Sequence, residues 1–220
     1  MRYKCIVFDH DDTVVKTTPD VHYPSFILTL KKLRPDYADM TLEQFVTYCF
    51  EYGFFNFCKD VLKFSAQEEA IQYADWTAFV KDKNPQSYDG FDKVFQVLRQ
   101  KQIPICVVSH SDEKIIARDY KNNFGFEPLM IFGWGDAETR RKPSPYPLQE
   151  ISRRLGIACS DVLVVDDMKC GYQMAKAAGA DFAYAGWSSS DAIKQIHEFM
   201  TKNADYCFDS VCRLKDFLSK

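Results

Sequence analysis

The stretch Lys4-Cys5-Ile6-Val7-Phe8-Asp9-His10-Asp11-Asp12-Thr13-Val14-Val15 decides how the rest of the chain is interpreted. An apolar run of strand-forming residues ends in three carboxylates within four positions, followed by a hydroxyl. Because neighbouring carboxylates repel one another, a cation, a shared proton or exposure to water must offset the repulsion. Taken alone, the pattern is also compatible with a plain polar turn after a strand. The rest of the chain must therefore supply matching chemistry.

The pattern of apolar residues divides the chain into two regions. After Val15 it is helical as far as Pro85, with capping boxes at Thr41 and Ser65. The helix after Ser65 is expected to turn Ile71, Ala74, Phe79 and Val80 inward. From Gly90, helices alternate with short apolar strands, which is typical of a parallel sheet covered on both faces. We predict an α/β fold, a doubly wound, Rossmann-like parallel sheet of residues 1–15 and 86–220, with an inserted α-helical domain of residues 16–85.

The composition restricts the class of partner. The chain has 220 residues, 46% of them hydrophobic, and a net charge of −3, which gives no electrostatic reason to expect nucleic acid or an anionic membrane as partner. No apolar stretch approaches the roughly 18 residues of a membrane span. Asp9 interrupts the first apolar run, so we expect no signal peptide and a cytoplasmic location. The eight cysteines show no CxxC pair and are interpreted as reduced thiols. The sequence does not indicate the oligomeric state.

Polar side chains come directly after three of the predicted strands. In an open parallel sheet, ligands bind at the carboxyl ends of the strands. The residues at these strand ends are Asp9 and Asp11, then Ser109 and His110 after Ile105–Val108, and finally Asp166 and Asp167 after Val162–Val165. Lys142 adds a cation on a loop just before a helix. We expect these side chains to meet at one edge of the sheet.

This combination of residues suits phosphoryl transfer. Acidic strand ends offer the oxygen ligands that Mg²⁺ prefers, and a bound cation resolves the crowding of carboxylates. Lysine and hydroxyl groups neutralise and orient phosphate oxygens, which is most of the catalytic task. An Asp can act as nucleophile and form an aspartyl-phosphate. We therefore expect an enzyme that acts on a small phosphorylated metabolite with Mg²⁺ as cofactor.

The ordered set Asp9-x-Asp11-x-Thr13, Ser109, Lys142 and Asp166-Asp167 resembles the four motifs of the haloacid dehalogenase superfamily. The match covers nearly the whole chain in order, so it is far more specific than one Asp-x-Asp. The helical insertion after the first motif resembles that superfamily's helical cap. The fourth motif, Asp166-Asp167-x-x-x-Gly171, resembles the phosphoglycolate phosphatase and beta-phosphoglucomutase branches, which use adjacent acids.

Carried onto this sequence, the resemblance implies catalytic roles for Asp9, Asp11 and Lys142. Asp9 attacks the phosphorus. Asp11 protonates the leaving oxygen and later activates the water that hydrolyses the aspartyl-phosphate. Lys142 bridges the transferring group and the nucleophile. His10 is left without a role, because Asp11 already fills that of acid and base.

The resemblance also implies a substrate-binding set and a metal-ligand set. Ser109 is expected to hydrogen-bond the transferring phosphoryl group, and Thr13 sits where the family has a Thr or Val. Outside the family motifs, His110 is placed with them as an expected substrate-binding residue, because it follows Ser109 at the strand end. The implied Mg²⁺ ligands are the Asp9 carboxylate, the Asp11 backbone carbonyl, Asp167, and Asp166 directly or through water.

Asp12 departs from the family pattern, which usually has Gly at this position. Glycine suits unusual backbone angles, and Asp is among the better-tolerated replacements. We expect the turn to form, with an extra negative charge near the phosphate that puts the rate or the substrate range in doubt.

The sequence leaves more than one function open. The leading hypothesis is a Mg²⁺-dependent phosphatase whose cap closes over the site and selects the substrate. A phosphomutase of the beta-phosphoglucomutase type would keep the aspartyl-phosphate but return the phosphoryl group to a sugar. A non-catalytic module that binds a phosphorylated ligand is the third alternative, and Asp12 is its only support. Dehalogenase chemistry has no phosphoryl oxygen to protonate and would leave Asp11 unexplained.

Overall fold

The chain forms two compact units in a computed structural model that describes residues 2–220. One unit comprises Met1–Val15 and Gln86–Lys220, and the other comprises Lys16–Pro85. Within the described residues, no helix is long and apolar enough to cross a membrane.

The larger unit is built on a six-stranded sheet in which every strand pair is parallel. The strand order is β3-β2-β1-β4-β5-β6. The strands are β1 (Cys5–Phe8), β2 (Ile105–Val108), β3 (Met130–Phe132), β4 (Val162–Asp166), β5 (Asp181–Ala185) and β6 (Tyr206–Phe208). The predicted doubly wound parallel sheet is therefore confirmed. Because β1 lies between β2 and β4, the residues just after it stand where the strand order reverses, the usual place of a ligand site.

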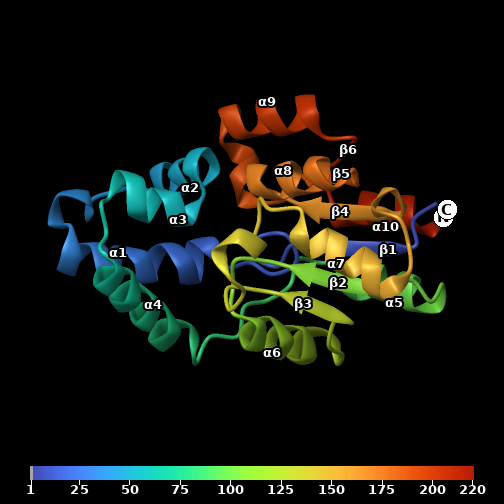
Figure 1. Cartoon of the computed structure of the whole chain (residues 1–220), viewed down its shortest axis with the longest axis horizontal. Coiled ribbons are helices and arrows are strands. Elements are labelled where there is room, and N and C mark those ends of the chain that lie inside the picture. Colours follow the sequence, from blue (N-terminus) through green and yellow to red (C-terminus); the bar gives the residue numbers. More distant parts are fainter. Residues whose placement is uncertain (1) are drawn as a thin grey trace. The chain divides into compact units, whose positions relative to one another are not determined.

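Helices cover both faces of the sheet (Figure 1). They are α5 (Phe91–Gln100), α6 (Glu113–Phe124), α7 (Tyr146–Leu155), α8 (Lys169–Ala178), α9 (Lys194–Asn203) and α10 (Val211–Ser219), with short 3-10 turns η4 (Glu138–Arg140), η5 (Cys159–Asp161) and η6 (Ser189–Ala192). Side chains of α5, α6 and α10 form one core with Ile6 and Phe8. Ala183 of β5 belongs to this core, and because successive strand residues alternate, the neighbouring Phe182 points to the other face of the sheet. Tyr172 of α8 packs edge-on against Phe182, so α8 covers that other face.

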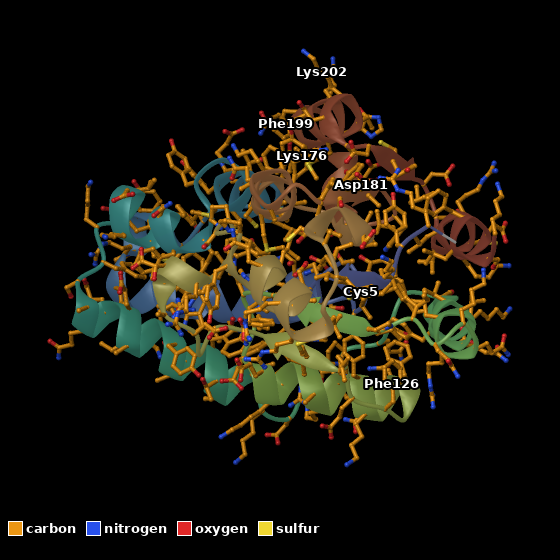
Figure 2. All side chains as sticks on the ribbon, turned by 45° about the vertical axis from the view of Figure 1, so that its right-hand side comes forward. Cys5, Phe126, Lys176, Asp181, Phe199 and Lys202 are labelled. Atoms are coloured by element: carbon orange, nitrogen blue, oxygen red, sulfur yellow. The ribbon has the colours of Figure 1, made fainter. Side chains whose placement is uncertain are left out.

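The arrangement separates a buried sheet from a polar surface. Figure 2 shows Cys5 of β1 within the unit, whereas Lys202 of α9 points outward. Cys5 is fully buried and its Sγ lies 3.8 Å from that of Cys106, so these thiols behave as small apolar side chains.

The smaller unit is helical, as the periodicity of residues 16–85 predicts. Its elements are η1 (Thr18–His22), α1 (Tyr23–Leu33), η2 (Pro35–Tyr37), α2 (Leu42–Tyr52), α3 (Phe54–Asn56), η3 (Phe57–Val61) and α4 (Ala66–Val80), drawn in blue to teal in Figure 1. Both predicted capping boxes form, at Thr41 with Gln44 and at Ser65 with Glu68. Aromatic rings fill the interior, with Phe26 at 5.3 Å from both Phe45 and Phe54.

The buried face of α4 differs from the prediction. Val80 is buried as predicted, but Ile71 and Ala74 are exposed, and Gln72 and Trp76 are buried in their place. Trp76 decides the orientation, because its indole Nε1 donates a hydrogen bond to His22 Nδ1 at 3.1 Å and its ring stacks on that imidazole. Counting apolar residues at helical spacing gave too little weight to this one large ring.

The two ends of the helical insertion leave the larger unit side by side. Val15 pairs with Ser87 in an antiparallel bridge. The Tyr88 N–H also donates to the Val14 carbonyl at 3.0 Å. Residues 16–85 are therefore inserted between two points of the larger unit that are already hydrogen-bonded to each other.

Candidate active site

The Asp9 carboxylate lies at the carboxyl end of β1 and is held by a buried lysine. Asp9 N–H donates to the Val165 carbonyl at 2.9 Å, so the pairing of β1 with β4 continues to the acidic residue. Lys142 Nζ lies 2.7 Å from Asp9 Oδ1 and 2.7 Å from Asp166 Oδ2. All three side chains are buried. Lys142 thus ties the ends of β1 and β4 together at the centre of the sheet edge.

A main-chain hydrogen bond and a glycine keep Asp166 in this position. The Met168 N–H donates to Asp166 Oδ1 at 2.8 Å. A Cβ on Gly171 would lie 2.1 Å from Asp166 Oδ2, so the first turn of α8 can approach the carboxylate only because residue 171 has no side chain. The Asp-Asp-x-x-x-Gly spacing therefore has a steric cause in this chain.

Hydroxyl groups surround the neighbouring Asp167. Ser188 and Ser190 donate to Asp167 Oδ2 at 2.7 and 3.0 Å. Thr13 Oγ1 lies 3.5 Å from Asp167 Oδ1 and 3.4 Å from Asp9 Oδ2, and so stands between the two carboxylates. The Trp187 indole N–H donates to the Thr13 carbonyl at 2.9 Å, which fixes that turn against the loop after β5.

The Asp11 carboxylate is oriented by the loop after β2. Ser111 Oγ donates to Asp11 Oδ2 at 2.6 Å and Ser109 Oγ donates to the same oxygen at 3.1 Å. The Ser111 N–H donates to Ser109 Oγ at 3.1 Å, which fixes the first hydroxyl. Both serines therefore fix the same oxygen of the Asp11 carboxylate.

His110 faces the main chain of the lysine loop. Its Nε2 lies 3.0 Å from the Lys142 carbonyl, and its ring meets Trp134 edge-on. Burial, with the nearby Lys142 charge, lowers the pKa of His110 to about 4, so the imidazole is neutral near pH 7 and its N–H can donate to the carbonyl. The Arg141 guanidinium covers Trp134, with its Cζ 4.0 Å from the ring centroid.

Asp12 adopts the backbone conformation that explains the family's glycine. Its φ is +57°, in the left-handed region that Asp tolerates better than most residues. Its N–H donates to the Val15 carbonyl at 2.7 Å, closing the turn. The side chain is buried and its charge adds to the rise in the pKa of Asp167.

The electrostatics of the site indicate a deficit of positive charge. Burial raises the pKa of Asp9 to about 7, with Lys142 opposing the rise and Asp166 and Asp11 adding to it. Burial, Asp166 and Asp12 likewise hold the pKa of Asp167 well above its ordinary value. Asp166 and Asp9 outweigh the effect of burial on Lys142 and keep its pKa well above the ordinary value, so it is charged.

The residues present fit a hard divalent cation. Carboxylate oxygens of Asp9, Asp166 and Asp167 lie within 4.8 Å of one another, and all three residues are buried. With all three carboxylates ionised, the single ammonium of Lys142 leaves two negative charges, which a divalent ion would balance and so lower the raised pKa values. Oxygen donors of this kind suit Mg²⁺.

The structure brings the predicted residues to one edge of the sheet. The carboxyl ends of β1, β2 and β4 carry seven of them: Asp9, Asp11, Thr13, Ser109, His110, Asp166 and Asp167. The eighth, Lys142, lies on the loop before α7 and reaches this edge through its Nζ. Sequence reasoning places Ser111 at the end of β2 without a role and misses Ser188 and Ser190, although all three serines hold carboxylates. Applying the strand-end rule to β5 as well would have found Ser188 and Ser190, because Ser188 lies in the loop just after that strand and Ser190 lies in the 3-10 turn η6 that follows it.

The chain belongs to the haloacid dehalogenase-like hydrolases. The model of that family matches residues 3–179. The motifs that suggested the resemblance lie within this range, and the parallel sheet and the acidic edge agree with it.

Two curated relatives are both phosphoglycolate phosphatases. The one from Thiobacillus denitrificans is 23% identical over 185 residues, covering 80% of this chain and 80% of the relative. The one from Neisseria meningitidis is 33% identical over 85 residues, covering 38% of this chain and 35% of the relative.

Solved structures share the fold over nearly the whole chain. A protein from Bacteroides fragilis described as a haloacid dehalogenase-like hydrolase has a TM-score of 0.79 at 19% identity, covering 96% of this chain and 99% of that chain. CbbY from Rhodobacter sphaeroides in complex with phosphate has a TM-score of 0.71 at 18% identity, covering 96% of each chain. At these identities the similarity shows the fold alone.

Proposed function

We propose that this hydrolase is a Mg²⁺-dependent phosphatase that acts on a small phosphorylated metabolite through an aspartyl-phosphate on Asp9. The observation that carries the proposal is the placement of the Asp9 carboxylate, which shares Lys142 with Asp166 and lies with Asp166 and Asp167 in one buried cluster. The two phosphoglycolate phosphatases among the relatives support a small phosphate ester as substrate.

The first step forms the covalent intermediate. An oxygen of Asp9 attacks the phosphorus, the bond from phosphorus to the ester oxygen breaks, and Asp11 donates its proton to that leaving oxygen. Ser109 and Ser111 keep the Asp11 carboxyl in one orientation for this transfer. The charged Lys142 stabilises negative charge on the phosphoryl oxygens beside Asp9.

The second step releases the product. Asp11, now a carboxylate, takes a proton from water, which attacks the phosphorus and displaces the Asp9 carboxylate as inorganic phosphate forms. Asp9, Asp166 and Asp167, with the Asp11 carbonyl, would hold Mg²⁺, which supplies positive charge that attracts and neutralises the phosphate. Thr13 and the serines at 188 and 190 fix the carboxylates for that purpose.

A variant of the nucleophile tests the proposal. The Asp9→Asn protein should lose more than about 10³-fold in kcat on an aryl phosphate, because removal of a nucleophile abolishes the covalent route. Wild-type turnover should need Mg²⁺ and stop with a chelator. Asp36→Asn, which changes an exposed carboxyl in the helical unit, is the matched control and should keep wild-type kcat. Hydrolysis retained by Asp9→Asn would show that the assigned nucleophile is wrong.

Product analysis separates the proposal from its alternatives. A panel of phosphate esters that includes 2-phosphoglycolate and sugar phosphates should release inorganic phosphate in proportion to substrate consumed. An isomeric sugar phosphate in place of free phosphate would indicate a phosphomutase. No Mg²⁺-dependent turnover on any ester would indicate a binding module.

A further inference from the structure

His10 is a buried titratable residue that the proposed mechanism does not use. It stands between Asp9 and Asp11, and successive side chains of an extended segment point to opposite sides. Its side chain therefore leaves the acidic edge and enters the core, where it has no exposed surface. The imidazole stacks on the Tyr120 ring of α6, with centroids 5.8 Å apart and planes 28° apart.

The polar partner of His10 is a buried carboxylate on α6. His10 Nε2 lies 3.3 Å from Asp119 Oδ2, and Asp119 is 1% exposed. The Arg118 guanidinium contacts the other oxygen, Asp119 Oδ1, through Nε and Nη2, both at 2.8 Å. Burying a carboxylate costs desolvation free energy unless its oxygens are hydrogen-bonded. A pair of apolar side chains could fill the same space without that cost, so stability alone does not explain the His10–Asp119 pair.

The pair connects α6 to the catalytic loop at a second point. The first point is Ser109 and Ser111, just before α6 begins at Glu113, which hold Asp11. The second is Asp119, about two turns further along the helix, which holds His10. The His10 carbonyl in turn accepts hydrogen bonds from the Val14 and Val15 N–H groups at 3.0 and 3.1 Å, so the whole turn after β1 depends on the orientation of this residue.

We propose that Asp119 is a positioning residue that, through His10, fixes the rotation of the Asp9–Asp11 segment; the proposal rests on the proposed function. Because Asp9 and Asp11 flank His10, a rotation of the chain at residue 10 moves both carboxylates together. A displacement of about 1 Å in a reacting group can cost on the order of 10²-fold in rate. Asp119 is itself buried, so it acts on the segment through His10.

Three variants, with Asp119→Asn as a milder fourth, separate positioning from plain stability. Asp119→Leu removes the carboxylate that His10 Nε2 contacts, and His10→Phe leaves Asp119 with Arg118 as its remaining charged partner. The double variant replaces the His10–Asp119 pair by apolar side chains. We expect kcat to fall about 10- to 100-fold in all three, with KM changed less than about 3-fold. We expect the double variant to regain wild-type resistance to urea, since an apolar pair often substitutes for a buried ion pair. Asp119→Asn, which keeps an acceptor, should lose less kcat than Asp119→Leu.

A control and a measurement without turnover complete the test. Glu127→Gln removes the exposed Lys121–Glu127 pair near the end of α6 and should leave kcat unchanged. Amide hydrogen exchange of residues 9–15 should be faster in the double variant than in the wild type, although both are equally stable. A double variant with wild-type kcat and wild-type exchange would overturn the inference.

Phosphate release by the wild-type protein tests the proposed function separately from the role of Asp119. If the wild-type protein itself releases no phosphate, the proposed function fails, and hydrogen exchange alone decides on Asp119. Unchanged protection of residues 9–15 in the stable double variant would then overturn the positioning role.

Discussion

Asp12 shows how one residue can depart from a family pattern and still satisfy the backbone. The turn needs a positive φ, and Asp12 supplies +57° with its N–H bonded to the Val15 carbonyl. The departure therefore changes the charge of the site more than its shape. The buried Asp12 carboxylate stands close enough to Asp167 to raise its pKa.

Substitutions at residue 12 should separate conformation from charge. Asp12→Gly keeps the left-handed conformation at no steric cost, so its free energy of unfolding should be within about 1 kcal/mol of wild type. Asp12→Val places a branched side chain at positive φ and should destabilise the protein by about 1–3 kcal/mol. Urea denaturation measures both. Equal stability of the two variants would contradict the backbone explanation.

Gly171 offers a second test at the residue scale. The Cβ of Gly171→Ala would lie 2.1 Å from Asp166 Oδ2, so Asp166 must move away from Lys142. We expect kcat to fall on the order of 10²-fold while the protein remains folded. Gly135→Ala is the matched control, because no heavy atom lies within 4 Å of its added Cβ. Wild-type kcat in Gly171→Ala would show that Asp166 does not need its present position.

At the scale of elements, the sequence predicts where strands end but does not predict which side chains from neighbouring strand ends contact each other. Strand β2 has the bounds Ile105–Val108 that its apolar run predicts, since a short buried strand between polar turns is a local signal. Asp9 and Asp166 were found for the same reason. Ser188 and Ser190 reach Asp167 only once β5 lies beside β4, so their contact depends on tertiary structure.

Helix α4 shows the same limit within the helical unit. Its start was predicted from Ser65 and Glu68, because a capping box is a contact between residues three positions apart. Its buried face depends on the Trp76–His22 contact with η1, which joins residues far apart in the sequence. Apolar periodicity alone does not contain that information.

The start of α4 is also stabilised by an ion pair, Arg34–Glu68, whose contribution depends on pH. The Arg34 guanidinium holds the pKa of Glu68 down at about 2, and the Ser65 N–H adds to the effect. Because the folded pKa lies below the ordinary value near 4.5, the contribution to stability is present above about pH 4.5 and is lost as the pH falls toward 2. The melting temperature should therefore be higher for wild type than for Glu68→Gln at pH 6, with the difference shrinking below pH 4.5.

A matched variant controls for general effects of charge. Glu43→Gln removes an exposed carboxylate in the first turn of α2, for which no ion pair is seen among residues 2–220. Its difference from wild type should be smaller at pH 6 than that of Glu68→Gln. A Glu68→Gln difference that stays constant from pH 6 to pH 3 would show that the Arg34 contact contributes no stability.

At the scale of the whole molecule, residues 16–85 are inserted at one point of the larger unit and contribute no strand to the sheet. The turn that leaves the larger unit at Val15 and the one that re-enters at Ser87 are bridged to each other within that unit. The buried carboxylates, Lys142 and the serines that hold them all belong to the same unit. The chemistry and the helical insertion are therefore separable in the chain, and we propose that the insertion serves as a cap.

Replacing residues 16–85 with a short Gly-Ser linker tests whether the larger unit carries the chemistry and the insertion selects the substrate. We expect the shortened protein to keep the Mg²⁺-dependent hydrolysis of a small aryl phosphate, because its nucleophile, acid and lysine remain. It should lose the preference among natural phosphate esters, since a cap that excludes water and selects the substrate acts through its own side chains. The readout is the spread of kcat/KM over one ester panel, measured for both proteins after circular dichroism has shown that the shortened chain is folded. A spread equal to that of the full chain would place specificity in the larger unit and contradict the role of residues 16–85 as a cap.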